Sequence, residues 1–163
     1  MDESLSVQAD LMKAFPRGIG NLRVPRARRV FGQVPYERFP EVFEHAVRRM
    51  GFSMLCTITA LDGGASFEVI YHLARPSGVT LNLSTLVPKD RPVLQTVTGC
   101  FPAADLYERE MVDLMGIQVQ GLPTGHRYPL PDDWPDGQYP LRKDWKAPSV
   151  SGQPDAPEDQ LHA

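Results

Sequence analysis

Apolar residues recur at helical spacing in residues 36–50. There, one apolar stripe is formed by Val42, Phe43, Ala46, Val47 and Met50. Pro40 falls in the first turn, where its missing N–H removes no intrahelical bond, and Gly51 stands where a helix commonly ends. The pattern therefore predicts an amphipathic helix over residues 36–50.

Apolar and polar residues alternate with period two in three later segments, residues 53–61, 66–74 and 79–86. Turn sequences separate them, Asp-Gly-Gly at 62–64 and Arg-Pro-Ser-Gly at 75–78. Strands joined by such short turns pair as an antiparallel meander with one covered face. A further strand is predicted before the helix, at residues 28–34.

Two more helices are predicted, one in each half of the chain. A short one spans residues 3–15, with Leu5, Ala9, Leu11 and Met12 loosely on one side. The other spans residues 102–115 and ends at Gly116. The fold class that follows is α+β, an antiparallel sheet of about four strands covered by two main helices.

The charged residues of the helix at 102–115 fall on different faces. Asp105, Arg109 and Asp113 share one row, so Arg109 is bracketed by two carboxylates. Glu110 is predicted on the apolar face, where a carboxylate needs a cation or must reach water. Both interpretations stay open; the cation would be an arginine of residues 23–29 or of another chain. Glu108 is predicted on the polar side.

A proline-rich arm follows the α+β region. Half of the 16 prolines lie from Pro123 onward, and both tryptophans, Trp134 and Trp145, are in the same stretch. Such a segment tends to extend, and its large aromatic residues need a surface to bury against. We expect a helix and basic linker at 1–26, a core domain at 27–121, an extended partner-binding arm at 122–148 and a disordered tail at 149–163.

The composition, 42% hydrophobic and 23% charged with a net charge of −3, is typical of a globular protein and gives no reason to expect nucleic acid. No run approaches the about 20 apolar residues that cross a bilayer, and the acidic N-terminus lacks a secretory pattern. Membrane contact is therefore expected only through partners. A basic stretch is either solvated or binds an acidic surface or anionic lipid: Arg17, Arg23, Arg26, Arg28 and Arg29.

No catalytic, cofactor-binding or metal-ligating residue is predicted in this chain. Cys56 and Cys100 are 44 positions apart and the four histidines are scattered, so no ligand set for zinc or an iron–sulfur cluster can be assembled from spacing. Cys56 is expected to be a small buried residue. His72, beside Glu68 on a predicted strand, is expected to be a surface or cross-strand polar residue.

Three segments carry a resemblance to the 30 kDa subunit family of respiratory complex I. Residues 101–117, with the triplet Glu108-Arg109-Glu110, resemble the family's hallmark helix. The strand at 67–73 resembles its hairpin strand, and Pro-Leu-Arg-Lys-Asp at 140–144 resembles its ending. Residues 122–127 depart from the family pattern. Residues 130–135 resemble the related subunit of energy-converting nickel–iron hydrogenases.

The resemblance implies a non-catalytic scaffold subunit in the peripheral arm of a membrane-bound energy-converting oxidoreductase, which couples electron transfer to ion translocation. A hydrogenase type is favoured over the 30 kDa subunit of a proton-pumping NADH-quinone oxidoreductase. The implied partners are the large catalytic subunit and an iron–sulfur subunit. They would carry the iron–sulfur clusters and either nickel–iron or flavin and quinone, at the cytoplasmic face of the inner membrane.

Eight residues are predicted to bind partners: Glu108, Arg109, Glu110, Asp113, Trp134, Arg142, Lys143 and Trp145. Two other classes of function remain open. One is a stand-alone acid–base enzyme that uses Glu108, Glu110 and His72, although the sequence has no phosphate loop or nucleophile motif. The other is a binding module that docks through its basic N-terminal arm.

Overall fold

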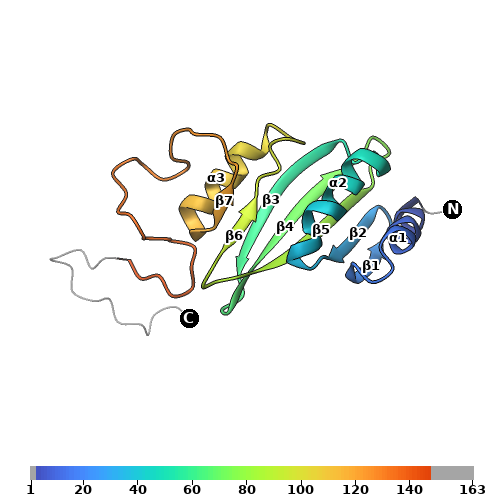
Figure 1. Ribbon diagram of the computed structural model, residues 1–163, viewed down its shortest axis with the longest axis horizontal. Coiled ribbons are helices and arrows are strands. Elements are labelled where there is room, and N and C mark those ends of the chain that lie inside the picture. Colours follow the sequence, from blue (N-terminus) through green and yellow to red (C-terminus); the bar gives the residue numbers. More distant parts are fainter. Residues whose placement is uncertain (1–2, 148–163) are drawn as a thin grey trace, which may run out of the picture.

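The structure is a computed structural model and describes residues 3–147 of the chain, so the predicted disordered tail lies outside the described residues. It is a mixed α+β fold (Figure 1). Its helices are α1 (Glu3–Ala14), the 3-10 helix η1 (Tyr36–Arg38), α2 (Phe39–Met50) and α3 (Ala104–Met115). Its strands are β1 (Gly20–Arg26), β2 (Arg29–Gln33), β3 (Met54–Asp62), β4 (Ser66–Ala74), β5 (Thr80–Pro88), β6 (Val93–Gln95) and β7 (Gln118–Gln120).

The main sheet has five strands in the order β1-β2-β5-β4-β3. The predicted antiparallel meander β3-β4-β5 is confirmed. The prediction of a fully antiparallel sheet of about four strands is wrong, because β2 pairs with β5 in parallel. β1 falls in the predicted linker; its residues are mostly exposed and its register with β2 is irregular, so it shows no period-two signal. A second, two-stranded sheet pairs β6 and β7 in parallel.

Helix α2 covers one face of the main sheet, as its apolar stripe predicts (Figure 1). Phe39, Val42, Phe43 and Ala46 are buried. The ring of Tyr71 on β4 lies 4.7 Å from that of Phe39 and 5.4 Å from that of Phe43, measured between centroids. The helix ends at Gly51, whose φ of 74° suits glycine.

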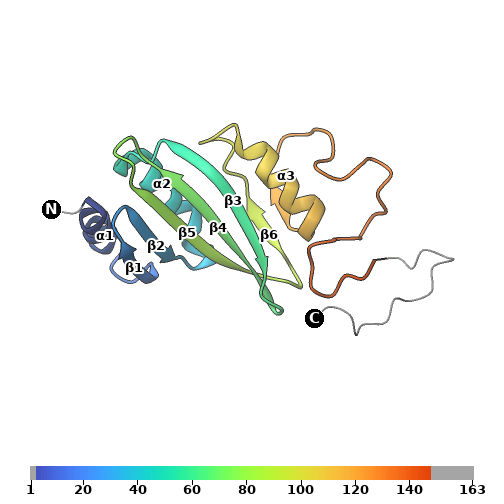
Figure 2. The same cartoon turned by 180° about the vertical axis from the view of Figure 1, so that it is seen from behind.

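On the opposite face of the sheet, none of the described helices lies over the central strands (Figure 2). His72 lies there, with Nδ1 2.6 Å from Oδ1 of Asn82 and Nε2 3.0 Å from Oγ1 of Thr59. Asn82 in turn donates to the carbonyl of Val30, at 3.0 Å. These bonds form a polar chain across β3, β4, β5 and β2, so the expectation of a cross-strand role for His72 is confirmed.

Burial differs from the sequence pattern in two places. Helix α1 packs through Ser4, Val7 and Leu11, whereas Leu5 and Met12, placed on the same side as Leu11 in the predicted helix, are exposed. The prediction that Cys56 is buried is wrong, because Cys56 is exposed. It lies at an irregularity in the β3–β4 pairing, between Leu55 and Thr57, which breaks the alternation of inward and outward side chains.

Candidate functional site

Helix α3 and the segment that follows it form the candidate site, at the end of the molecule opposite α1 (Figure 1). The helix ends at the predicted residue and begins two residues later than predicted, and Gly116 ends α3 with a φ of 68°. Between β7 and residue 147 the described chain has no helix or strand. This arm is attached to the domain by side chains of α3, by Asp62 on β3 and by Lys89, the residue after β5.

The two glutamates of α3 exchange the positions that the sequence predicted. Glu108 is fully buried, on the same face as Ala104, Met111 and Met115. Glu110 is exposed, so its placement on the buried face is wrong. Leu106, which also lies on the predicted apolar face, is exposed, because α3 turns a different side, that of Ala104, Glu108 and Met111, toward the rest of the chain.

Glu108 holds the loop between β6 and α3. Thr96 Oγ1 donates to its Oε2 at 2.6 Å, and the backbone N–H of Val97 donates to its Oε1 at 2.7 Å. Burial nevertheless raises the pKa of Glu108, because these two bonds only partly replace lost hydration. Burial, and then the charge of Glu108, also raise the pKa of Tyr71.

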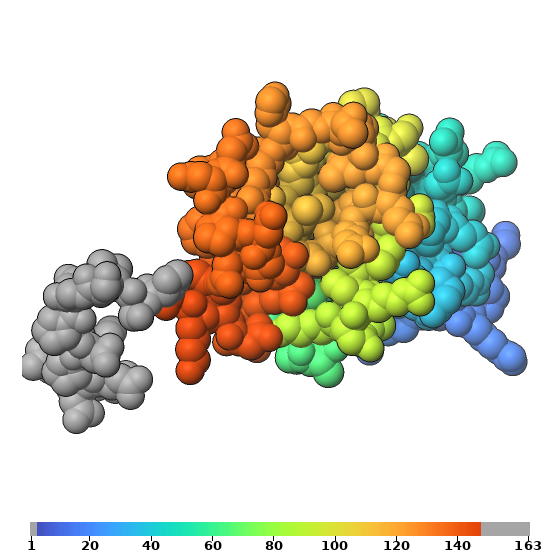
Figure 3. Space-filling model, turned by 60° about the vertical axis from the view of Figure 1, so that its left-hand side comes forward, coloured from blue at the N-terminus to red at the C-terminus, as the bar shows by residue number. Residues whose placement is uncertain are grey.

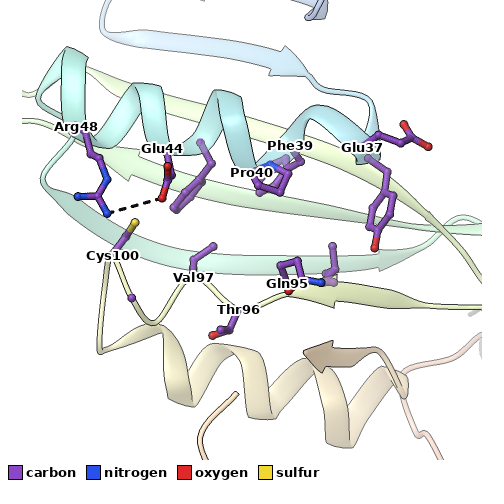
Figure 4. Close-up of a pocket in the computed structure, with 13 residues that line it drawn as sticks. Glu37, Phe39, Pro40, Glu44, Arg48, Gln95, Thr96, Val97 and Cys100 are labelled. Atoms are coloured by element: carbon purple, nitrogen blue, oxygen red, sulfur yellow. Dashed lines mark ion pairs between the residues drawn. The ribbon is translucent and has the colours of Figure 1, made fainter. Parts of the chain in front are cut away.

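The loop held by Glu108 forms one wall of a cavity of about 370 Å³, and α2 forms the other (Figure 4). The lining includes Phe39 and Phe43 from α2 and Leu94 and Val97 from the opposite wall. At one end, Arg48 and Glu44 form an ion pair 3.7 Å long at the surface. The side chains that line the cavity are mainly apolar.

Arg109 joins α3 to the first part of the arm. It forms a bidentate pair with Asp105, at 3.0 Å from Nε and 2.9 Å from Nη2, which raises the pKa of Arg109. Its remaining N–H groups donate to the carbonyls of Pro123 at 2.6 Å and His126 at 3.2 Å. A hollow lies between α3 and residues 122–128, ringed by the arm (Figure 3).

Asp113 was predicted to bracket Arg109 from the other side, but it binds the arm. Its Oδ1 accepts from Nε of Arg127 at 3.2 Å, and its Oδ2 accepts from the backbone N–H of Leu130, also at 3.2 Å. Arg127 donates further to the carbonyl of Trp134, at 2.7 Å. The carboxylate of Asp113 thus holds the arm at two residues, Arg127 and Leu130.

The two tryptophans pack against each other within the arm. Their ring centroids are 6.3 Å apart, and both indole N–H groups donate to Gln138, that of Trp134 to the carbonyl and that of Trp145 to Oε1. Both side chains are half-buried within this chain. The arm therefore makes its own local structure, and a partner would meet an already folded surface.

The arm's Pro-Leu-Arg-Lys-Asp segment is held by both its backbone and its side chains. Arg142 Nε donates to the carbonyl of Met115 at 2.7 Å, and its guanidinium lies 4.3 Å from the ring centroid of Tyr139. The backbone N–H of Lys143 donates to Asp62 at 2.9 Å. Arg142 thereby supplies a hydrogen-bond donor to a backbone carbonyl at the C-terminal end of α3.

Asp62, at the end of β3, is the anchor that the sequence did not reveal. Lys89 Nζ donates to it at 2.8 Å, and this bond, with the N–H groups of Lys143 and Gly64, lowers the pKa of Asp62 to about 2 despite burial. Lys89 also pairs with Asp144, at 3.1 Å. The Asp-Gly-Gly sequence predicts only a turn, and a partner 81 positions away leaves no mark in local sequence.

The residues proposed for acid–base catalysis are not assembled into a site. Glu108 binds Thr96 and Val97, His72 binds Asn82 and Thr59, and none of the hydrogen bonds among residues 3–147 joins these two side chains to each other or to Glu110. No group of three or more His, Cys, Asp or Glu residues in the described part of the chain is arranged to hold a metal ion. No described helix is long and apolar enough to span a membrane.

Comparisons with known proteins agree on one family. The sequence model described as the respiratory-chain NADH dehydrogenase 30 Kd subunit matches residues 33–151. The membrane-bound hydrogenase subunit beta of Pyrococcus furiosus is 44% identical over 89 residues, 52% of this chain and about half (51%) of that protein. NADH-quinone oxidoreductase subunit 5 of Thermus thermophilus is 34% identical over 149 residues, 82% of this chain and 67% of that one.

A solved structure shares the fold. A chain in the structure of the membrane-bound sulfane sulfur reductase, an archaeal respiratory membrane complex, superimposes with a TM-score of 0.77. The match covers 97% of this chain and 98% of that chain, at 24% sequence identity. The likeness therefore extends over nearly the whole fold.

Proposed function

The chain belongs to the family of the 30 kDa subunit of respiratory-chain NADH dehydrogenase, and we propose that it acts as a non-catalytic scaffold in the peripheral arm of a membrane-bound oxidoreductase complex. Its relatives are subunits of NADH-quinone oxidoreductase and of membrane-bound hydrogenase. Since both types match, the preference for a hydrogenase type over the NADH-quinone type is not supported. The complex transfers electrons, and this subunit organises its neighbours.

The observation that carries this proposal is the use that α3 makes of its charged residues. Arg109 and Asp113 bind the arm through backbone carbonyls, a backbone N–H and Arg127, and Glu108 braces a loop. These groups are committed to structure and are not aimed into a catalytic pocket. They hold an irregular segment of more than twenty residues in one shape, which lowers the entropy cost of binding a partner.

The surface left for a partner combines apolar and charged side chains. Leu106 on α3 and Leu141 on the arm are 51% and 57% exposed, and Glu110, one turn after Leu106 on α3, is also exposed. Apolar residues of this size on a folded surface are typical of the core of a protein interface. We propose that this surface is covered, at the cytoplasmic face of the membrane, by the large catalytic subunit and an iron–sulfur subunit.

The redox groups are proposed to reside in those partners: iron–sulfur clusters, with either nickel–iron or flavin and quinone. The side chains of residues 3–147 offer no cluster of ligands for a metal, and the two cysteines lie in different elements, β3 and the loop before α3. Purified alone, the chain should be colourless and redox-silent. A stoichiometric iron–sulfur absorption band in the isolated chain would contradict the proposal.

Purification of the tagged chain from its own host tests the scaffold role. We expect it to bring down an iron–sulfur protein and a large catalytic subunit. Leu106→Glu should reduce the recovered partners by about tenfold or more, because a charge in an apolar interface core is costly. Leu86→Glu, at a similarly exposed leucine on β5, is the matched control. Equal recovery with both variants would exclude α3 as the docking surface.

A further inference from the structure

The hairpin of β1 and β2 presents four arginines at the end of the molecule farthest from the arm (Figure 1). Arg23, Arg26 and Arg28 are exposed and Arg29 is half-buried. Within residues 3–147, none of the four has a carboxylate oxygen within 4.0 Å. On the neighbouring α1, Glu3 pairs with Arg75 instead, so within the described residues this surface carries positive charge that no ion pair balances, in a chain whose net charge is −3.

The hairpin is held in one conformation. The carbonyl of Arg28 accepts from the backbone N–H of Thr80 at 3.0 Å, and its own N–H donates to Ser4 Oγ at 2.7 Å. Arg29 Nη1 donates to Thr80 Oγ1 at 3.0 Å. Arg28 itself adopts a φ of 63°, a conformation that favours glycine. A residue with a Cβ in this conformation strains the backbone locally, and such strained residues are concentrated at functional sites.

Exposed apolar side chains lie on the helix beside the hairpin. Leu5 and Met12, two turns apart on the outward side of α1, are 50% and 58% exposed, and α1 packs against β1 and β2. The nearby acidic groups are Asp10 on α1 and Glu68, which lines a hollow with Arg23 without forming an ion pair within 4.0 Å. Arginine and methionine are both enriched in protein interfaces, and here they lie next to an exposed leucine.

We propose that this arginine hairpin, with the outward side of α1, docks onto an acidic surface of a second protein subunit, distinct from the partner of the arm. A protein fits better than a lipid surface. The four cations are all arginines, whose planar guanidinium pairs with carboxylates through two parallel bonds. Because it pairs with phosphate in the same way, the preference for a protein rests on the neighbouring helix. A helix of 12 residues with two large exposed apolar side chains offers little to insert into a bilayer.

The proposal extends the scaffold role to a bridge between two partners, but its test is separate. The double variant Arg23→Gln/Arg26→Gln is compared with Arg49→Gln/Arg91→Gln, which removes the same charge from exposed arginines elsewhere. In the tagged complex, the hairpin variant should lose one subunit by about tenfold as salt is raised, while the partner lost in Leu106→Glu is retained. Equal subunit recovery in both double variants would overturn the proposal.

Three further measurements test whether the partner is a protein and whether docking can be separated from folding. Arg26→Lys places an amine on the hairpin, so a zero-length carbodiimide should cross-link it to an aspartate or glutamate of another subunit in the assembled complex. Arg28→Gly removes a cation while favouring the turn, so weaker assembly with an unchanged or higher Tm separates docking from folding. If the full-length chain instead sediments with vesicles of phosphatidylglycerol and not of phosphatidylcholine, and no cross-link forms, the surface binds membrane and the proposal fails.

Discussion

Replacing Glu108 tests the central packing feature of the candidate site. Its carboxylate is fully buried and accepts hydrogen bonds from Thr96 Oγ1 and the Val97 N–H. Glu108→Ala leaves the Val97 N–H without an acceptor, breaks the bond from Thr96 Oγ1 and opens a small cavity between α3 and the loop. An unsatisfied buried donor costs about 1–3 kcal/mol, and the lost packing adds about 1 kcal/mol. We expect the free energy of unfolding to fall by about 3 kcal/mol.

Glu108→Gln separates shape from charge. Glutamine keeps an acceptor for the Val97 N–H, and its amide can donate to Thr96 Oγ1, which then donates to Thr98 Oγ1, 2.8 Å away. Because burial raises the pKa of Glu108 above 4.5, the charged form is disfavoured in the folded chain. Its contribution to stability is therefore present below pH 4.5 and is lost as the pH rises through the folded pKa. Near neutral pH, the glutamine variant should match or exceed the parent by up to about 1 kcal/mol.

Urea unfolding followed by circular dichroism measures both effects. Parent, Glu108→Ala and Glu108→Gln are compared at pH 4.5 and 7.5, with Glu110→Ala as the exposed control on the same helix. The advantage of the glutamine variant over the parent should grow between the two pH values. The control should change stability by less than about 0.5 kcal/mol. If Glu108→Ala behaved like Glu110→Ala, the burial of Glu108 and the account of this loop would both be refuted.

Three other changes test how the arm is held. Asp62→Asn should lower the free energy of unfolding by about 2 kcal/mol at pH 7, because the pKa of Asp62 falls from 3.8 to about 2 on folding. The difference in urea midpoint between variant and parent should vanish as the pH falls through that range. Gly116→Ala should lower the free energy of unfolding by about 2 kcal/mol, because Gly116 has a φ of 68° and a Cβ there would lie 2.5 Å from Arg142 Nη2 and from Tyr139 Cζ. An unchanged urea midpoint would mean that these two side chains move aside freely. Deleting residues 129–146 should leave a cooperative unfolding transition at a lower midpoint but abolish recovery of the arm's partner on purification; loss of cooperativity would make the arm part of the core.

Periodicity in the sequence was sufficient for the elements that pack against the main sheet. The strands β3, β4 and β5 were predicted within a residue or two, because their apolar residues must follow the period of the backbone. The helix α2 ends where it was predicted to end but begins three residues later, after the 3-10 helix η1. The glycines at 51 and 116 marked both helix ends for a backbone reason, since each adopts a positive φ. The family followed from motifs in β4, in α3 and at residues 140–144.

Elements without a buried face escaped prediction. β1 is mostly exposed and irregular, so its residues carry no alternation, and the parallel pairing of β2 with β5 joins strands about fifty residues apart. Which side of α1 is buried was also undetermined, because Leu5 and Met12 are as apolar as the buried Val7 and Leu11. Local sequence shows that a helix is amphipathic more clearly than it shows which side meets the sheet.

By itself, the sequence determined the three α-helices, the strands β2 to β5, the family and the segment that carries the candidate site. Only the tertiary structure decided what the site's charged residues do. Glu108 and Glu110 are two positions apart on one helix, yet one is fully buried and the other exposed. Asp62 and Lys143, 81 positions apart, meet in one hydrogen bond. The physical reason is that the hydration, pKa and partners of a charged side chain depend on its surroundings, and for these residues the surroundings come from distant parts of the chain.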